Sequence, residues 1–377
     1  MIRSGSLVIY TLFGLTVGLV LLGVIMVLSA SQFILANDPN HNIYLYMGKQ
    51  LIFLSLGLAG MSFFATRDYN LWDRYSRWIM LFAIVLLALV FSPIGHESGG
   101  GRRWIHTPLT NLQPSDFTKI AVIIYLSAVW SDRRERLGSF MKGVLFPMLF
   151  VGFALILILL EPDHSTTFFI GMVAMVIWFA AGGRILHVVP VFVAMSVGVL
   201  AALYHRPILF QRIIAFLQPE KYPDKYIQVL QARTAFAYGG WWGTGLGDGH
   251  QQLGYVPEVH TDFIFSTMGE ELGYVKCIIA VGMFLALVLL GYWIALKCQN
   301  PFGRLLAVGC TSAIGLQTAI NLAVVTGSMP TTGISLPFIS YGGSSLLISM
   351  SLVGLLISVA KDTFSAETAR GRPGRRA

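Results

Sequence analysis

The sequence predicts an all-α, polytopic membrane protein with about ten transmembrane helices. Of its 377 residues, 55% are hydrophobic and only 12% are charged, and the mean hydropathy is +0.70. A soluble domain carries about 25% charged residues, so this chain has too few charges to cover a globular surface in water. Its apolar residues also gather in runs of about 20, the length that a helix needs to cross a bilayer.

The apolar runs predict helices near 7–30, 48–66, 77–95, 116–131, 143–160, 165–182, 185–204, 263–296, 304–326 and 340–361. The first run is too long for the apolar part of a cleavable signal, so we expect it to be retained. The fourth is the weakest, because it is short and carries Asp116 and Lys119. The three cysteines lie in or beside apolar segments, which argues against a disulfide framework.

Basic residues predict the orientation of the chain. Ten crossings put both termini on one side, and that side holds about 16 of the 26 Lys and Arg residues, as the positive-inside rule expects of the cytoplasm. We therefore predict one transmembrane domain over 1–361, followed by a basic, disordered cytoplasmic tail over 362–377. The net charge of +8 follows from this orientation and does not indicate a nucleic-acid partner.

A long loop over about 205–262, between the seventh and eighth spans, is predicted to lie outside the cytoplasm. Apolar residues recur at helical spacing over 208–217, and a second amphipathic stretch covers 226–237, so both stretches are predicted to lie at the membrane interface. The glycine-rich stretch 239–249 disfavours a helix and lets the backbone approach a ligand closely.

Polar residues gather in four segments on the same outer side. These segments are 99–119, 161–167, the end of the long loop near 256–262, and 327–346. The cytoplasmic connections are short and charged by comparison. We therefore expect the four outer segments to converge on one cavity that carries the chemistry.

Asp262 stands where the polar run "PEVHTD" meets the apolar run "FIF". Asp is a favourable helix N-cap, although the capping box is incomplete because position 265 is Phe. The other interpretation is a carboxylate at the water–lipid boundary that accepts a proton. Both interpretations stay open, and they are compatible.

Glu270 and Glu271 lie about two helical turns further along. Ionisable groups inside a membrane usually face the bundle interior or a wet cavity. They could form a buried ion-pair network, with Lys276 as a structural cation, or line a cavity that holds a charged headgroup, with Lys119 as a functional one.

Several other residue types suit an anionic ligand. Arg102 and Arg103 are suited to phosphate oxygens, while Trp104 beside them is typical of an interfacial anchor. Gly342 and Gly343 open a predicted helix whose first N–H groups suit an anion. Glu161 and Asp163 flank a proline as turn residues, and with His260 and Asp262 they could bind Mg²⁺ or Mn²⁺, whereas no spacing indicates zinc.

Five motifs carry a resemblance to a known family. They are "NLQPSDFTK", "EPD", "GLGDGHQQLGYVPEVHTDFIF", "GEELG" and "TGISLPFISYGGSSL", in this order within about residues 10 to 361. The sequence thus resembles the SEDS family (shape, elongation, division and sporulation), typified by FtsW, RodA and SpoVE. The resemblance implies an inverting peptidoglycan glycosyltransferase that polymerises lipid II into β-1,4 glycan strands on the outer face of the bacterial cytoplasmic membrane.

The resemblance also implies roles and partners. It places the essential acid, a general base, at Asp262. Our substrate-binding candidates are Arg102, Arg103, Trp104, Lys119, Glu161, Asp163, Arg233, His260, Glu270, Glu271, Gly343, Ser344 and Ser345. The implied partner is a class B penicillin-binding protein transpeptidase, FtsI-like (penicillin-binding protein 3-like) in division or penicillin-binding protein 2-like in elongation. Divisome or elongasome membrane proteins and membrane lipid complete the expected partners.

The sequence departs from the family pattern at two turns. The usual "PDLGT" is "PDHSTT" here, and "PTTG" replaces the "PTKG" turn that is frequent in FtsW-like members, which is a RodA-like feature. "KQLIFLSLGL" and "LGYVPEVHTDFIFSTMGEELGYV" are more FtsW-like, so we favour a division-type protein. The alternatives are a RodA-type polymerase, a lipid II flippase, and a non-catalytic scaffold for the transpeptidase.

Overall fold

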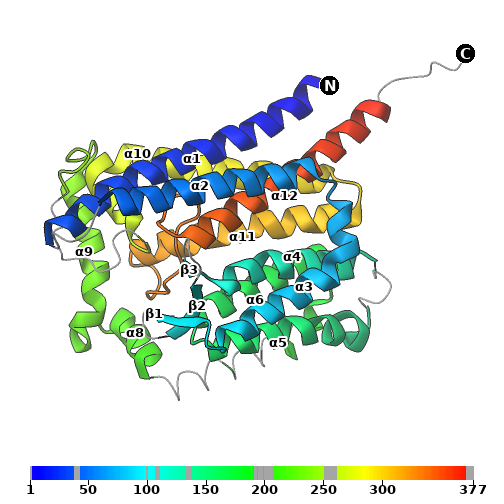
Figure 1. Ribbon diagram of the computed structural model, residues 1–377, viewed down its shortest axis with the longest axis horizontal. Helices are drawn as coiled ribbons and strands as arrows, with labels where there is room; N and C mark the ends of the chain where they lie inside the picture. The colour runs from blue at the N-terminus through cyan, green and yellow to red at the C-terminus, as the bar shows by residue number, and fades with distance from the viewer. Residues whose placement is uncertain are drawn as a thin grey trace, which may run out of the picture.

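Helices dominate the computed structural model, and most of them run along the long axis of an elongated bundle (Figure 1). The structure describes residues 2–37, 43–98, 101–106, 111–132, 138–187, 189, 190, 193, 198, 207–249 and 261–370. α1 begins and α12 ends at the same end of the bundle, and α8, α9 and the strands lie at the opposite end (Figure 1). We call the end with α8, α9 and the strands the loop end.

Long helices occupy nine of the ten predicted segments in the described part of the chain. They are α1 (Ile2–Asn37), α2 (Ile43–Thr66), α3 (Asn70–Val90), α4 (Pro114–Asp132), α5 (Phe146–Leu160), α6 (His164–Ala180), α10 (Ile264–Lys297), α11 (Pro301–Val325) and α12 (Gly343–Arg370). A π-helical turn, η2 (Met141–Leu145), leads into α5. Apart from the short helix η3 (Ile185–His187), the predicted seventh span at 185–204 lies mainly outside the described residues.

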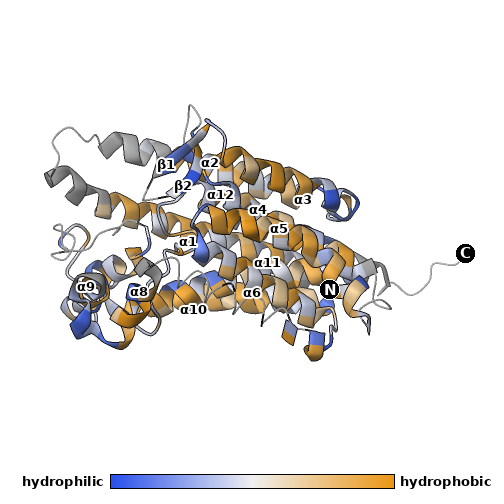
Figure 2. Ribbon diagram, turned by 90° about the horizontal axis from the view of Figure 1, so that it is seen from below, coloured by the Kyte–Doolittle hydropathy of each residue, from blue (hydrophilic) through white to orange (hydrophobic). Residues whose placement is uncertain are grey.

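The apolar lengths of these helices fit a multi-pass membrane protein. Five segments are long and apolar enough to cross a bilayer, namely Gly5–Ala30, Met141–Leu160, Ile264–Lys297, Pro301–Val325 and Gly343–Ser365. Gln50–Thr66 and His164–Ala180 are shorter apolar helices. Apolar residues cover the length of the bundle, and hydrophilic residues gather towards its ends (Figure 2). The total of ten crossings stays a prediction.

α12 lies at the centre of the bundle. It packs against α2, α11 and α1, and the apolar residues of its middle turns are buried. α10 by contrast leaves apolar residues such as Ile279, Leu289 and Leu296 exposed, with 58%, 60% and 82% of their surface accessible. A membrane-spanning helix at the edge of a bundle turns such a face to lipid or to another transmembrane helix. α12 also continues to Arg370, beyond the predicted end of the last span at 361.

The connection between α3 and α4 folds as a small sheet, which the sequence analysis did not predict. α3 ends at Val90 rather than near 95, and β1 (Gly95–Ser98), β2 (Gly101–His106) and β3 (Asn111–Leu112) pair antiparallel in the order β1-β2-β3. Arg102 Nε donates to Gly95 O at 2.9 Å across the hairpin. The predicted all-α class therefore holds for the bundle but not for this connection.

The two amphipathic stretches of the long loop are helical, as predicted. α8 spans Pro207–Leu217, a short turn η4 spans Pro219–Lys221, and α9 spans Pro223–Gly239. α8 packs on α9 and η4, and α9 packs on α10 and α11. The loop helices are thus attached to the bundle largely through α9.

A segment of the loop, residues 240–247, is inserted into a break in α10; we call it the strap. Gly273 adopts φ 80°, which interrupts the helix. Tyr274 N and Val275 N donate to Gly240 O and Trp241 O, at 2.9 and 3.3 Å, instead of to the preceding turn. The carbonyls that they leave, those of Glu270 and Glu271, accept from Thr244 N and Gly245 N at 2.9 and 3.1 Å. The strap therefore satisfies these four backbone groups at the break.

Candidate functional site

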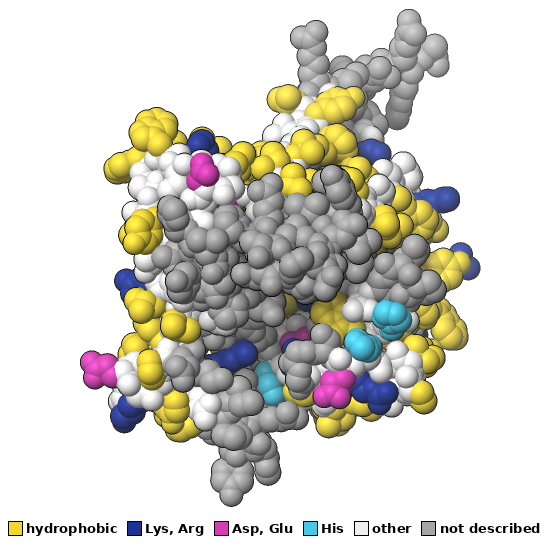
Figure 3. All heavy atoms as spheres, turned by 60° about the vertical axis from the view of Figure 1, so that its left-hand side comes forward, with side chains coloured by type: hydrophobic (Ala, Val, Ile, Leu, Met, Phe, Trp, Pro, Cys, Tyr) yellow, Lys and Arg dark blue, Asp and Glu magenta, His cyan; other side chains and the backbone are white. Residues whose placement is uncertain are grey.

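A polar cavity with a volume of about 420 Å³ opens at the loop end. Its walls come from β2, α4, α6 and the turn before it, α8, the residues before α10, α11, the connection between α11 and α12, and the beginning of α12. The lining residues are Arg103, Trp104, Gln113, Asp116, Lys119, Pro162, Asp163, His164, Ser165, Thr166, Phe169, Arg212, Thr261, Asp262, Gln317, Thr332, Gly333, Ile334, Ser335, Tyr341, Gly342, Ser344 and Ser345. The four polar segments converge here, as predicted. Charged and histidine side chains are visible on this end of the molecule (Figure 3).

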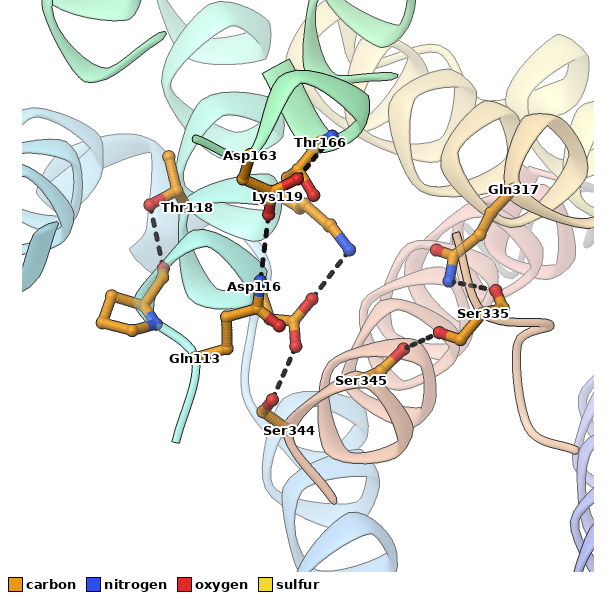
Figure 4. Close-up of polar contacts among 11 residues, drawn as sticks. Gln113, Asp116, Thr118, Lys119, Asp163, Thr166, Gln317, Ser335, Ser344 and Ser345 are labelled. Atoms are coloured by element: carbon orange, nitrogen blue, oxygen red, sulfur yellow. Dashed lines mark hydrogen bonds and ion pairs between the residues drawn. The ribbon is translucent and has the colours of Figure 1, made fainter. Parts of the chain in front are cut away.

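Asp116 and Lys119 form an ion pair on the first turns of α4. Lys119 Nζ lies 2.7 Å from Asp116 Oδ1, and Ser344 Oγ donates to Asp116 Oδ2 at 2.6 Å (Figure 4). Lys119 Nζ also lies 5.4 Å from the centre of the Phe169 ring, a cation–π distance. Asp116 thus fixes Lys119 and connects α4 to the beginning of α12.

Asp163 supports the turn between α5 and α6. It is the N-cap of α6, where its Oδ1 accepts from Thr166 N at 3.1 Å, and its Oδ2 accepts from Gln113 Nε2 at 3.0 Å (Figure 4). A carboxylate at a helix N-terminus is stabilised by the exposed N–H groups and by the helix dipole. Asp163 therefore holds the turn against the segment before α4 while one edge of it lines the cavity.

Arg103 is directed to the cavity by main-chain acceptors. Its Nε donates to Glu161 O at 3.0 Å and its Nη2 donates to Pro162 O at 2.7 Å. A guanidinium has five N–H donors, so these two bonds leave donors for a ligand. Trp104, the next residue of β2, also lines the cavity.

Glu161 lies behind this turn and is 1% exposed. Neither of its carboxyl oxygens has a hydrogen-bond partner among the described residues. Burial raises the pKa of this carboxyl to about 8, the charge of Asp163 adds to the shift, and the charge of Arg103 opposes it. Glu161 is therefore mainly neutral at pH 7, and it is not among the lining residues.

Asp262 lines the cavity one position before the N-cap of α10. The structure gives the N-cap to Phe263, which has no side-chain cap, so the N-cap interpretation of Asp262 is wrong. Its backbone is fixed, because Asn321 Nδ2 donates to Asp262 O at 2.9 Å and Ser340 Oγ donates to Thr261 O at 2.6 Å. A Cβ built on Gly333 would lie 3.4 Å from Asp262 Oδ2, so the opposite wall comes close to the carboxylate.

Arg212 on α8 is a lining residue that the sequence analysis did not single out. Burial lowers the pKa of its guanidinium from the usual value, the charge of Asp262 opposes this shift, and the like charge of Arg103 adds to it. Arg212 is exposed to solvent overall, and it also lines the cavity. The sequence offered one sign of this role, because Arg212 is a single basic residue within the mainly apolar stretch 208–217.

Five other candidates are described but lie outside the lining. Arg102 bonds to the hairpin backbone, and Arg233 on α9 packs beside Gly327. Gly343 lies against α2, where a Cβ would come within 1.9 Å of the Phe53 ring, and Gly342 lines the cavity instead. Glu270 and Glu271 belong to the break in α10, and His260 lies outside the described residues.

Glu271 joins the strap to the bundle. Its two carboxyl oxygens accept from Ser29 Oγ at 2.6 and 2.7 Å, and its Oε1 also accepts from Gly247 N at 3.2 Å. Lys276, the predicted structural cation, donates to Trp242 O at 3.2 Å. Glu271 and Lys276 are thus placed to support the strap.

The acidic residues do not form a metal-ligand set of their own. Within the described part of the chain, no group of three or more His, Cys, Asp or Glu side chains is arranged to hold a metal ion. The oxygens of Asp116 and Asp163 already accept hydrogen bonds from protein donors. A divalent ion would therefore need most of its ligands from a bound substrate or from water.

Comparisons with known proteins agree on one family. The family model for FtsW, RodA and SpoVE, described as "Cell cycle protein", matches residues 10–364. The chain is 40% identical over 352 residues to "Probable peptidoglycan glycosyltransferase FtsW" of Geobacter sulfurreducens, covering 92% of this chain and 93% of the relative. It is 36% identical over 357 residues to "Stage V sporulation protein E" of Bacillus subtilis, covering 94% and 96%.

Solved structures share the fold. One is a chain from a peptidoglycan synthase complex studied for its coordination of polymerization and crosslinking, with a TM-score of 0.77, 25% identity, and coverage of 94% of this chain and 98% of that one. Another is the rod shape determining protein RodA of Thermus thermophilus, with a TM-score of 0.67, 23% identity and coverage of 94% and 96%. Because the identity to RodA of Thermus thermophilus is only 23%, this second similarity supports the fold alone.

Proposed function

The chain belongs to the FtsW/RodA/SpoVE family, and we propose that it is a peptidoglycan glycosyltransferase of the FtsW type. It polymerises lipid II into β-1,4 glycan strands for septal wall synthesis in cell division. The observation that most directly supports this function is that Asp262 lies on the wall of a polar cavity at the loop end of an apolar bundle (Figures 1 and 2). A substrate with a lipid tail and a sugar headgroup reacts at such a boundary. Relatives named FtsW, at about 40% identity, support the division type over the elongation type.

The proposed step is an inverting displacement at the anomeric carbon of the growing strand. The 4-hydroxyl of GlcNAc on the incoming lipid II attacks C1 of the terminal MurNAc, which is α-linked to undecaprenyl pyrophosphate. The new O4–C1 bond forms as the bond from C1 to the phosphate oxygen breaks, and the pyrophosphate leaves with that electron pair. Asp262 accepts the hydroxyl proton as general base and later releases it to water.

The cations of the cavity are placed to stabilise the leaving pyrophosphate. Arg103 presents a fixed guanidinium, and Lys119 contributes a point charge held by Asp116. Gly342, Ser344 and Ser345 lie at the beginning of α12, where free N–H groups and the helix dipole favour a phosphate. Donors preorganised around developing charge typically contribute the largest share of such catalysis.

Mg²⁺ or Mn²⁺ is proposed to enter together with the pyrophosphate, because the described residues of the cavity do not supply a metal-ligand set of their own. The ion would neutralise charge on the leaving group. Polymerisation measured with and without a chelator tests this, and equal rates in EDTA would contradict it.

We further propose that the protein lies in the bacterial cytoplasmic membrane with both termini in the cytoplasm and the cavity outside. Its partner would be a class B penicillin-binding protein of the FtsI type. The contact for the partner's transmembrane helix is proposed at α10 and α11, and the exposed apolar face of α10 supports the α10 part of it.

The deciding experiment is lipid II polymerisation by the purified chain, together with its cognate penicillin-binding protein carrying an inactive transpeptidase site. Wild type is expected to make polymer, while folded Asp262→Ala and Asp262→Asn make none. Equal polymer from all three would move the base elsewhere. No polymer from the folded wild-type complex with added Mg²⁺ or Mn²⁺ would instead support a flippase or a scaffold.

A further inference from the structure

The main chain at Asp262 is joined to the segment between α11 and α12 by an amide of α11. We call this segment, residues 326–342, the connection. Asn321 Nδ2 donates to Asp262 O at 2.9 Å and to Ile334 O at 2.8 Å. One side chain therefore fixes the residue before α10 and the connection relative to each other and to α11.

Ser340 makes a second bridge of the same kind. Its Oγ accepts from Leu336 N at 2.8 Å and donates to Thr261 O at 2.6 Å. Ser340 N also donates to Leu336 O at 3.1 Å, so these two residues of the connection close a turn. The successive carbonyls of Thr261 and Asp262 are thus each held by a side chain that also holds the connection.

The two bridges are buried, and their geometry has a cost. Asn321 is 1% exposed and Ser340 is 4% exposed. Asn321 Oδ1 has no hydrogen-bond partner among the described residues, although a buried acceptor without a partner is unfavourable. Phe338, inside the turn that Ser340 closes, has φ 65°, which is strained for a residue other than glycine. Costs of this kind gather where a fold holds a functional geometry, which directs attention to Asp262.

The bridges set how far Asp262 lies from the opposite wall of the cavity. Gly333 precedes Ile334, and a Cβ built on Gly333 would lie 3.4 Å from Asp262 Oδ2. Gln317 Nε2 holds the next carbonyl, that of Ser335, at 2.9 Å (Figure 4). A general base has to come within about 2.6–3.2 Å of the oxygen whose proton it accepts. A shift of either segment would therefore change the fit of a hydroxyl beside the carboxylate.

We propose that Asn321 and Ser340 are positioning residues for proton transfer from the attacking sugar hydroxyl to Asp262. They hold the carboxylate at the distance from Gly333 at which that hydroxyl fits between the two walls. Neither Asn321 nor Ser340 lines the cavity, so both act through Asp262 rather than by contact with the substrate. This inference rests on the proposed function, because it takes Asp262 as the base.

The first test measures kcat and KM for lipid II polymerisation by the full chain with its cognate penicillin-binding protein, whose transpeptidase site is inactive. Asn321→Leu removes both donated bonds and should lower kcat about 30- to 100-fold, because a misplacement of about 1 Å can cost about 100-fold. Its KM should change less than about threefold, because no substrate contact is lost. Ser340→Ala should lower kcat about tenfold, and Ser340→Thr, which keeps the hydroxyl, should recover most of this loss.

Thr318→Val on α11 and Ser351→Ala on α12 are the matched controls. Their hydroxyls donate within their own helices, from Thr318 Oγ1 to Ile314 O at 2.9 Å and from Ser351 Oγ to Leu347 O at 2.8 Å. Both variants should keep kcat within about twofold of wild type, because neither hydroxyl joins two segments. Unchanged monodispersity and melting temperature establish that a variant folds. If Asn321→Leu does not fold, Ser340→Ala decides the test.

A double-mutant cycle with Asp262→Glu separates positioning from general destabilisation. Glutamate already displaces the carboxylate, so Asn321→Leu and Ser340→Ala should each cost less than about threefold in that background. A residue that only stabilises the bundle would cost the same factor in both backgrounds. Equal factors, or a kcat within about twofold of wild type for the folded single variants, overturn the proposal. Wild-type polymer formation by Asp262→Ala would instead overturn the proposed function, so the two failures are separable.

Discussion

Replacing Asp116 by alanine removes the partner of a lysine that is largely shielded from water. The side chains of Lys119 and Asp116 are 11% and 6% exposed, and they meet at 2.7 Å. Breaking a buried ion pair from one side costs about 3–5 kcal/mol, because the remaining charge is left uncompensated. We therefore expect Asp116→Ala to lower the free energy of unfolding by an amount in this range.

Two serines next to each other give an internal scale for this effect. Ser344 donates to the Asp116 carboxylate at 2.6 Å, while the Ser345 hydroxyl lies 3.2 Å from the Ser335 hydroxyl. A hydrogen bond to a charged group contributes about 1.5–3 kcal/mol, and one between neutral groups contributes about 0.5–1.5 kcal/mol. The expected order of destabilisation is Asp116→Ala, then Ser344→Ala, then Ser345→Ala.

The assay is reversible unfolding in mixed micelles with a rising fraction of denaturing detergent, followed by tryptophan fluorescence. The double variant Asp116→Leu with Lys119→Met should recover much of the stability, because replacing both partners by apolar groups removes the uncompensated charge. Equal effects of Ser344→Ala and Ser345→Ala, or a cost below about 1 kcal/mol for Asp116→Ala, would refute this reasoning.

Three further predictions follow from the turn, the break and the hairpin. Burial raises the pKa of Glu161 in the folded protein to about 8, above the usual value of 4.5 for a glutamate, so its contribution to stability is complete below about pH 4.5 and is lost as the pH rises towards 8. Glu161→Gln should therefore flatten the fall in melting temperature between pH 5 and 8. Gly243→Ala and Gly273→Ala should each cost more than about 2 kcal/mol in the same unfolding assay, because both glycines have positive φ and a Cβ on either would collide with backbone atoms of the facing segment. Gly282→Ala, on α10 like Gly273 but with open space at its Cβ, is the control and should be neutral or stabilising. Of these two arginines, Arg103 lines the cavity and Arg102 does not, so Arg103→Ala should reduce the polymerisation rate at least about tenfold and Arg102→Ala less than twofold. Equal losses in the two variants would contradict the placement of Arg103 in the substrate site.

The sequence predicted the bundle well because each transmembrane helix is a local property. Runs of apolar residues identify a helix such as α5 or α11 without knowledge of its neighbours. The sheet between α3 and α4 has no comparable signal, because its strands are short and their pairing depends on tertiary contacts. The end of α3 was placed five residues late for the same reason.

The site was predicted in part, since polar residues between apolar runs stand out. That argument identified Asp262, Lys119, Asp163 and Arg103, all of which line the cavity. It could not identify Arg212, because a single arginine on an amphipathic helix is ordinary until the tertiary fold places it on the wall of the cavity. It also could not assign Glu271 to the strap, because the helix around Glu271 is interrupted by contacts from a loop distant in sequence.

The position of Asp262 is set by main-chain contacts, which makes it sensitive to side-chain length. Asn321 holds its carbonyl, Ser340 holds that of Thr261, and the strap holds the first turns of α10 at the break. Asp262→Glu keeps the charge but moves the carboxylate by about one methylene, and a misplacement of about 1 Å can cost about 100-fold in rate. We expect kcat to fall by about this factor in the lipid II assay while the binding of undecaprenyl pyrophosphate is retained. A glutamate variant with wild-type kcat would mean that the backbone contacts do not fix the base, because a rigidly held carboxylate cannot tolerate the extra length.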